Sequence, residues 1–277
     1  MNQEKIKQCC YICCLFLFLL VCFVGCSKKQ VEKDQWFNIK QKKQVTIGLD
    51  DSFVPMGFQN KAGKIVGYDI DLATAVFQLY GIKVNFQPID WSMKENELQN
   101  QTIDLIWNGY TKNAEREKKV AFSDSYMNNS QVIVTLKQKK IQYTSQLKNR
   151  VLGIQNGSSG YMSFENHPTS LKNYIKNQTP ILYDGFNEAF LDLESGQIDG
   201  LLIDKIYADY YLAHLKKKTN FYVFPANFKS EAFTVGIRKN DFLLKEKINS
   251  GFKQLRKNGK MEIIYKKWFA TTHHDKK

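Results

Sequence analysis

The most reactive side chains of this chain are concentrated at its start. All six cysteines lie within the first 26 of 277 residues, so the rest of the chain has no thiol for catalysis or disulfide bonding. They are Cys9, Cys10, Cys13, Cys14, Cys22 and Cys26. The four histidines, at positions 167, 214, 273 and 274, lack the spacing of metal ligands, and no metal site is expected. No nucleophile stands at a recognisable spacing from a base, which argues against an enzyme.

The first 25 residues have the layout of a secretory signal peptide. A polar start with Lys5 and Lys7 precedes a nearly unbroken apolar run from Cys9 to Val24, and the small residue Gly25 follows. The run is about 16 residues long, shorter than the roughly 20 that cross a bilayer as a helix. The sequence therefore predicts export, and an uncleaved membrane anchor is the alternative.

The end of this segment, Phe23-Val24-Gly25-Cys26, resembles the lipoprotein signals of bacteria. The resemblance implies that Cys26 is lipidated and becomes the first residue of the mature chain. Such signals usually carry leucine where this chain has Phe23. Residues 26–43, rich in Lys and Gln, are expected to form a tether. The folded part would then be extracytoplasmic and lipid-anchored to the outer face of the cell membrane.

The chain is basic, with 40 Lys and Arg against 27 Asp and Glu and a formal net charge of +13. Residues 1–25 carry two lysines and one glutamate, so the mature chain has 38 against 26 and a net charge of +12. The lysines are not grouped with aromatic residues in a recognition motif, which argues against nucleic-acid binding. A solvated surface near an anionic membrane explains the charge better.

Strands and helices are predicted to alternate in the first half of the mature chain. A β-branched run at 45–49 predicts a strand. A helix is expected from Gly67 to Gly81, and Asp69 and Asp71 are interpreted as helix-start residues, not as an acid–base pair. Further elements are a strand at 82–89, a helix at 95–100, a strand at 103–107 and a polar turn at 108–111. This alternation is typical of a parallel sheet flanked by helices.

The pattern restarts after an extended strand at 131–136. Later elements are strands at 151–154, 181–183, 198–203 and 233–237, and helices from 161 and at 186–193, 241–258 and 261–269. Two extended crossings, near 127–136 and 230–238, are what a two-lobed protein with a double hinge requires. The mature length of about 250 residues suffices for two lobes, each with its own core.

Five ordered segments make the chain resemble the family-3 extracellular solute-binding proteins of amino-acid ABC importers. The strongest, Gly67-Tyr68-Asp69-Ile70-Asp71-Leu72-Ala73, is similar to the family's Gly-aromatic-Asp-aliphatic-Asp-aliphatic signature, although Phe77 stands where a small residue is usual. The others are 47–50, 104–116, 153–159 and 196–204. The resemblance covers essentially all of residues 44–270.

The resemblance implies an α/β architecture, the type II periplasmic-binding-protein fold. In this fold two βα lobes are joined by a two-segment hinge, with the ligand cleft between them. Residues 44–127 and 231–277 would form lobe 1, and residues 128–230 lobe 2.

The resemblance also implies which residues hold a free L-amino acid, whose carboxylate and ammonium need partners when buried. The predicted ligand-binding residues are Asp50, Phe53, Trp107, Asn108, Gly109, Thr111, Arg116, Ser158, Ser159 and Asp204. Arg116 matches the guanidinium that grips the ligand carboxylate, and backbone N–H groups at Thr111 and Ser159 would add donors. Asp204 matches the acceptor of the ammonium.

The side-chain pocket follows from the same resemblance. Asp50, Phe53 and Trp107 match positions that line it, the two aromatic residues as walls. Asn108 stands where binders of basic amino acids commonly have a small hydroxyl residue, which favours a polar uncharged or mixed ligand.

Each of these residues also has a plain structural interpretation. Arg116 lies among charged residues that would normally be a solvated helix surface. Asp204 could be the N-cap of a helix at Ile206, and residues 157–159 could be an ordinary turn.

The function implied is the substrate-binding component of an amino-acid ABC importer. It would capture a polar or cationic L-amino acid by lobe closure and deliver it to a membrane permease with its ATPase. The protein is expected to be a monomer without a cofactor. The alternatives are an exported enzyme of the same fold, similar to cyclohexadienyl dehydratase, and an amino-acid sensory module.

Overall fold

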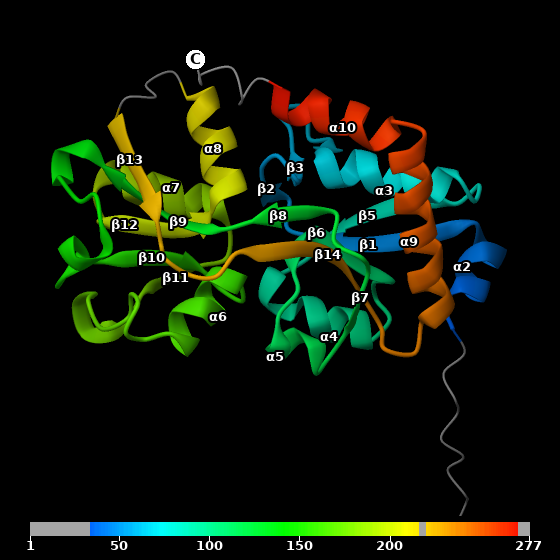
Figure 1. Ribbon diagram of the computed structural model, residues 1–277, viewed down its shortest axis with the longest axis horizontal. Coiled ribbons are helices and arrows are strands. Elements are labelled where there is room, and N and C mark those ends of the chain that lie inside the picture. Colours follow the sequence, from blue (N-terminus) through cyan, green and yellow to red (C-terminus); the bar gives the residue numbers. More distant parts are fainter. Residues whose placement is uncertain (1–33, 216–219, 271–277) are drawn as a thin grey trace, which may run out of the picture. The chain divides into compact units, whose positions relative to one another are not determined.

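The computed structural model describes residues 34–215 and 220–270 (Figure 1). The signal peptide predicted over residues 1–25 and the lipidation site Cys26 lie outside the described residues. The described residues form one compact unit. Within the described ranges no helix is long and apolar enough to span a membrane.

The first large sheet takes most of its strands from the N-terminal half of the chain. Its order is β5-β1-β6-β14-β7, with β8 also paired to β14. The strands are β1 (Gln44–Leu49), β5 (Lys83–Pro88), β6 (Leu105–Thr111), β7 (Ala121–Phe122), β8 (Met127–Asn129) and β14 (Glu231–Ile237). β1 runs parallel to β5 and β6, whereas β14 is antiparallel to its three partners.

The second large sheet is formed by the middle of the chain. Its order is β11-β10-β12-β9-β13, with β10 parallel to both neighbours and β9 antiparallel to both of its own. The strands are β9 (Gln131–Leu136), β10 (Leu152–Gln155), β11 (Ile181–Tyr183), β12 (Gly200–Asp204) and β13 (Phe221–Pro225). A small sheet also contains β2 (Ser52–Phe53), β3 (Gly57–Gln59) and β4 (Ile65–Val66).

Helices cover both faces of each large sheet (Figure 1). They are α2 (Trp36–Lys42), α3 (Tyr68–Gln78), α4 (Lys94–Gln99), α5 (Ala114–Glu117), α6 (Ser159–Asn166), α7 (Phe186–Ser195), α8 (Lys205–His214), α9 (Phe242–Lys257) and α10 (Lys260–Phe269). Short 3₁₀ turns are η1 (Trp91–Met93), η2 (Lys137–Lys139), η3 (Thr144–Leu147) and η4 (Lys176–Gln178). We call the first sheet with α2–α5, α9 and α10 lobe 1, and the second sheet with α6–α8 lobe 2.

Apolar spacing explains why the predicted helices form. In α9, Leu244, Ile248, Phe252 and Leu255 recur at three- and four-residue intervals, and all are buried in the core. The helix ends just before Gly259, whose φ of 75° lies in the left-handed region that favours glycine. The sequence prediction of this helix is confirmed.

The chain passes between the two sheets in the two places predicted. β8 leads into β9 through Ser130, and β13 leads into β14 through residues 226–230. Because these are the crossings near 127–136 and 230–238, the residues beside them sit where both lobes meet.

The segment predicted as a tether, residues 26–43, is partly folded. Residues 36–42 form α2, whose Trp36 and Ile39 are buried in the hydrophobic core. The Trp36 ring meets that of Tyr80 edge to face at 5.0 Å. The prediction is wrong for residues 36–42. Only two residues of this helix, Trp36 and Ile39, are buried, and among Lys and Gln they give a helical periodicity too weak to recognise in the sequence.

The polar turn predicted at 108–111 is also wrong, since these residues continue β6. Tyr110 and Thr111 pair with Thr234 and Phe233 of β14, and the register then shifts before Gly236. The strand keeps its pairing past the polar residues because β14, distant in sequence, supplies the hydrogen bonds.

Candidate functional site

Ten residues from both lobes line a small pocket, whose space between atoms is about 270 Å3 with the adjoining open solvent included. They are Asp50, Phe53, Trp91, Asn108, Gly109, Arg116, Gln155, Ser158, Ser159 and Asp204. Eight of the ten residues predicted from the sequence are among them, and the other two, Trp107 and Thr111, are not.

Parallel strands bring part of this set together. Asp50 follows β1, Gln155 ends β10 and Asp204 ends β12. The carboxyl ends of neighbouring parallel strands open on the same edge of a sheet, and ligand sites of α/β proteins gather there. The pocket therefore joins such an edge from each lobe.

The carboxylate of Asp50 is buried and bridges the lobes. Its Oδ1 accepts hydrogen bonds from the backbone N and Oγ of Ser52 at 2.8 and 2.7 Å, and its Oδ2 accepts one from Nε2 of Gln155 at 2.6 Å. Burial raises the pKa of Asp50, and these hydrogen bonds oppose the rise. Oδ1 of Asn108 accepts from the Asp50 backbone N at 3.2 Å, but its buried Nδ2 has no partner among the described residues.

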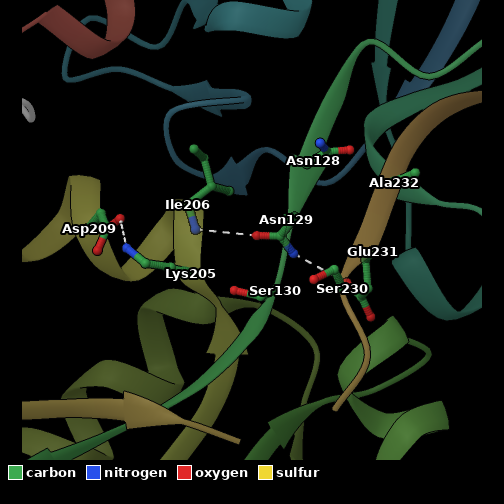
Figure 2. Close-up of a pocket in the computed structure, with 9 residues that line it drawn as sticks. All are labelled: Asn128, Asn129, Ser130, Lys205, Ile206, Asp209, Ser230, Glu231 and Ala232. Carbon is green, nitrogen blue, oxygen red and sulfur yellow. Dashed lines mark hydrogen bonds and ion pairs between the residues drawn. The ribbon is translucent and has the colours of Figure 1, made fainter. Parts of the chain in front are cut away.

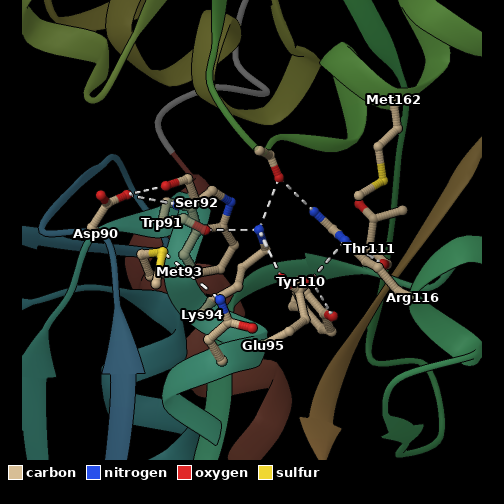
Figure 3. A network of polar contacts seen from close by, with 12 residues as sticks. Asp90, Trp91, Ser92, Met93, Lys94, Glu95, Tyr110, Thr111, Arg116 and Met162 are labelled. Carbon is tan, nitrogen blue, oxygen red and sulfur yellow. Dashed lines mark hydrogen bonds and ion pairs between the residues drawn. The ribbon is translucent and has the colours of Figure 1, made fainter. Parts of the chain in front are cut away.

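Arg116 is 2% exposed, although α5 is short and rich in charge. Its Nη1 donates to the carbonyl of Thr111 at 2.9 Å, and its Nη2 donates to the carbonyl of Gly157 in lobe 2 at 3.1 Å (Figure 3). The guanidinium lies over the ring of Tyr110, 4.4 Å from its centroid, and Nε is 3.6 Å from Glu95. Arg116 is thus a buried cation at the pocket, not a solvated helix charge.

Lys94 is a second buried cation beside the pocket. Its Nζ donates to the carbonyls of Trp91 at 2.7 Å and of Gly157 at 2.9 Å (Figure 3). Burial, and then the charge of Arg116, lower the pKa of Lys94 to about 7, while Glu95 at 3.6 Å opposes this. Two cations of lobe 1 therefore meet at one carbonyl oxygen of lobe 2.

Asp204 precedes α8, but its carboxylate does not cap that helix. Its Oδ1 accepts hydrogen bonds from Nδ2 of Asn129 and from Nε2 of Gln131, the latter at 2.9 Å. Burial, and then the negative charge of Glu231, raise the pKa of Asp204 to about 8. Two neighbouring acids, Asp204 and Glu231, therefore lie on this side of the site.

The N-terminus of α6 contributes Ser158 and Ser159. Oγ of Ser158 accepts from the backbone N of Tyr161 at 3.0 Å and so caps the helix. Oγ of Ser159 lies 3.3 Å from Oγ1 of Thr111 in lobe 1. A helix start of this kind favours a negative charge, such as the carboxylate of a ligand.

β6 bends at Gly109, whose φ is 57°. A Cβ on this residue would lie 2.4 Å from Cε1 of Phe53, so only glycine fits the bend. Its N–H donates to Oδ2 of Asp69 at 2.7 Å, and the hydroxyl of Tyr126 donates to the same oxygen at 2.9 Å. Burial raises the pKa of Asp69 to about 7. Asp69 therefore holds the pocket wall as well as lying in the first turn of α3.

Trp107 does not form the predicted aromatic wall. It is buried in the core, with ring centroids 6.1 Å from Tyr126 and 5.5 Å from Phe252. Neighbouring residues of a strand point to opposite faces, so the same geometry that aims Asn108 at the pocket turns Trp107 away. Trp91 lines the pocket instead.

Sequence reasoning missed Trp91, Lys94, Gln155 and Glu231. The signal for Gln155 was available, because it ends a predicted strand in front of a glycine-containing turn and a helix. Trp91 and Lys94 follow the strand at 83–88 but depend on a turn and a short helix that the sequence specified weakly. Nothing local distinguished Glu231.

Comparisons with known proteins agree with this architecture. Residues 45–271 match the model of the bacterial extracellular solute-binding proteins, family 3. The substrate-binding protein of an ABC uptake transporter from Streptococcus pneumoniae, solved with bound histidine, is 51% identical, with a TM-score of 0.85 over 86% of this chain and 96% of that one.

Curated relatives give the same result at lower identity. The arginine-binding extracellular protein ArtP of Bacillus subtilis is 28% identical over 83% of this chain and 87% of its own. The glutamine-binding protein GlnH of the same species is 28% identical over 88% of each chain. With these relatives, the predicted two-lobed α/β fold of type II is confirmed.

Proposed function

The chain belongs to family 3 of the bacterial extracellular solute-binding proteins, and from this membership we propose that it captures a polar L-amino acid for an ABC importer. The proposal is carried by one observation. A pocket between the lobes has a buried guanidinium and a helix N-terminus on one side and a buried carboxylate on another, in Arg116, Ser159 and Asp204. A free amino acid carries the complementary carboxylate and ammonium, and burying either without a partner costs several kcal/mol.

The polar groups on the remaining wall of the pocket indicate which kind of ligand side chain fits there. Asp50 offers a carboxylate that accepts hydrogen bonds, and the Nδ2 of Asn108 is a buried donor that lacks a partner among the described residues. A side chain with both a donor and an acceptor, such as a carboxamide or a neutral imidazole, satisfies the two together. A guanidinium has no acceptor to offer Asn108. We therefore expect glutamine or histidine to bind more tightly than arginine.

Capture proceeds by closure of the lobes. Ligand groups reach Arg116 and Asp204 at the same time only when the lobes approach, so binding shifts the population toward the closed form. The protein performs no reaction in this proposal. Its relatives named above are binding proteins.

The proposal places the protein outside the cytoplasm as a monomer, lipid-anchored through Cys26 and working with a permease and its ATPase. Support for the anchor comes from the sequence at residues 23–26, which lie outside the described residues. Two acyl chains retain a protein at a membrane where one would be marginal. Intact-mass measurement of the mature protein tests the anchor, since an unmodified Cys26 would contradict it.

Calorimetry on the protein stripped of ligand by unfolding and refolding tests the binding function. Titration with each of the twenty L-amino acids should give one or a few tight binders, with glutamine or histidine among them and their D-enantiomers silent. Absence of binding across the whole set, in protein that melts cooperatively, would refute an amino-acid binding role.

A further inference from the structure

Glu231 is a carboxylate at the site that no prediction had assigned. It begins β14, directly after the second crossing between the lobes, and it is only partly buried. Figure 2 shows it near Asn129 of the first crossing, among the residues that line a second pocket. Glu231 therefore lines that outer pocket, and its hydrogen bond to Oγ of Ser159 connects it to the ligand site.

The hydrogen bonds of Glu231 lead into the ligand site. Among the described residues, four groups donate to its Oε2: Gln131 Nε2 at 3.0 Å, Ser159 Oγ at 3.1 Å, Asn129 Nδ2 at 3.2 Å and Thr111 Oγ1 at 3.3 Å. Two of these donors, the amides of Asn129 and Gln131, also donate to Oδ1 of Asp204. The two carboxylates are thus joined through shared donors. They differ in that only Glu231 also reaches the hydroxyl groups of Thr111 in lobe 1 and Ser159 in lobe 2.

Among the described residues, no Lys or Arg forms an ion pair with either carboxylate. The charge facing Asp204 from lobe 1 is that of Arg116, which is bonded to the carbonyls of Thr111 and Gly157. Lys205 follows Asp204 in the chain, but it pairs with Asp209 (Figure 2). The groups between the acids, from β6, β8, β9 and α6, are neutral amides and hydroxyls. Two acids without a cation leave a place for one.

Resting on the proposed function, we propose that Glu231 and Asp204 together bind the α-ammonium group of the ligand. The ammonium carries three donors, and the pair offers carboxylate oxygens from the hinge and from lobe 2, with Thr111 of lobe 1 beside them. Glu231 is thereby a specificity residue for ligands with a free α-ammonium.

Proton release follows from the pairing. In the arrangement of the lobes seen here, burial and then the negative charge of Glu231 raise the pKa of Asp204, which favours its protonated form when no ligand is bound. An ammonium placed between the acids favours the ionised form of Asp204, and the proton leaves to solvent. Binding should therefore release protons below pH 8 and tighten as the pH rises, by at most about tenfold per unit for one proton.

The test compares Glu231→Gln with wild type and with Glu246→Gln, which removes an exposed acid of α9 remote from the pocket. The probes are the tightest binder among L-glutamine, L-histidine and L-arginine and its analogue lacking the α-amino group. Calorimetry at pH 6–8.5, in buffers of different ionisation enthalpy, gives the affinity and the number of protons released, and melting temperature checks folding. Protons that the ligand side chain itself gains or loses are the same for every variant, so they cancel when proton release is compared between variants.

We expect Glu231→Gln to bind the amino acid about 10- to 100-fold more weakly, to release fewer protons at pH 7 and to bind the deaminated analogue no worse than wild type. Glu246→Gln should match wild type. Equal weakening for both probes, or unchanged affinity and proton release, would overturn the role of Glu231 while leaving amino-acid binding intact. Failure of the wild type to bind any amino acid would instead overturn the proposed function itself.

Discussion

At the scale of single residues, burial distinguishes the site from the rest of a strongly basic chain. Arg116 is one of 40 basic residues, and the sequence around it is that of a solvated helix. In the structure it is 2% exposed and bonded to two carbonyls, one in each lobe. A buried guanidinium suits a carboxylate ligand because its planar fork has five N–H donors, and the two carbonyls use only two of them.

Arg116→Ala should weaken amino-acid binding by about 10- to 100-fold, the value of a hydrogen bond to a charged group. In this variant, buried Glu95 still has two partners, the hydroxyl of Tyr110 at 2.9 Å and the ammonium of Lys94. The free energy of unfolding should therefore fall by only about 1–3 kcal/mol. Calorimetry and urea unfolding measure the two effects.

Arg116→Lys is the matched variant, since it retains the charge but not the planar fork. It should bind better than Arg116→Ala and worse than wild type. Wild-type affinity in Arg116→Ala would show that the ligand carboxylate is held elsewhere.

At the scale of elements, β6 shows how a strand becomes a binding wall. Its first three residues are buried core, and then the bend at Gly109 brings Asn108 and Gly109 to the pocket. Asp69 of α3 accepts a hydrogen bond from the backbone N–H of Gly109 at this bend. The ring of Phe53 in β2 occupies the space that a Cβ on Gly109 would need. Asp69, from the motif at residues 67–73, thus supports the pocket wall without itself lining the pocket.

Gly109→Ala should therefore reduce both stability and binding. A left-handed residue with a side chain costs about 1–2 kcal/mol, and the added Cβ would also displace Phe53 from the pocket wall. Gly63→Ala is the control, because Gly63 has φ of 74° but nothing within 4 Å of its Cβ position. Both variants should lose stability in urea, but only Gly109→Ala should lose affinity. Equal affinities would exclude the clash with Phe53.

At the scale of the whole molecule, the two lobes contact each other directly as well as through a ligand. Gln155 reaches Asp50, and Lys94 and Arg116 both reach Gly157. The ring of Phe53 in lobe 1 lies 5.4 Å from that of Phe186 in lobe 2. These contacts stabilise the closed form whichever ligand is bound.

Lys94→Met should lower the population of the closed form, because it removes one contact between the lobes and leaves Arg116 as the partner of Glu95. Binding of every ligand should weaken by the same factor, about 2- to 10-fold, as expected for one net hydrogen bond. Calorimetry with two ligands measures the factor, and small-angle scattering should show a larger radius of gyration without ligand. A change in the ranking of ligands would mean that Lys94 acts on specificity instead.

Much of the architecture could be predicted from the sequence because it depends on local periodicity. The strands at 131–136 and 181–183 and the helices near the C-terminus are where apolar spacing indicated. Eight predicted residues line one pocket because strand ends and helix starts of βα units are local features as well.

Tertiary structure alone decided the rest. Whether Trp107 or Trp91 faces the pocket depends on strand direction and on a turn, and β6 continues past residue 107 only because distant β14 pairs with it. Glu231 approaches Asp204 because two crossings of the hinge lie side by side, and such a contact leaves no trace in the spacing of either segment. The sequence alone determined where most of the helices and strands form, since these follow from neighbouring residues. Folding decided which side chains become buried partners, because burial and charge pairing act between segments that are far apart along the chain.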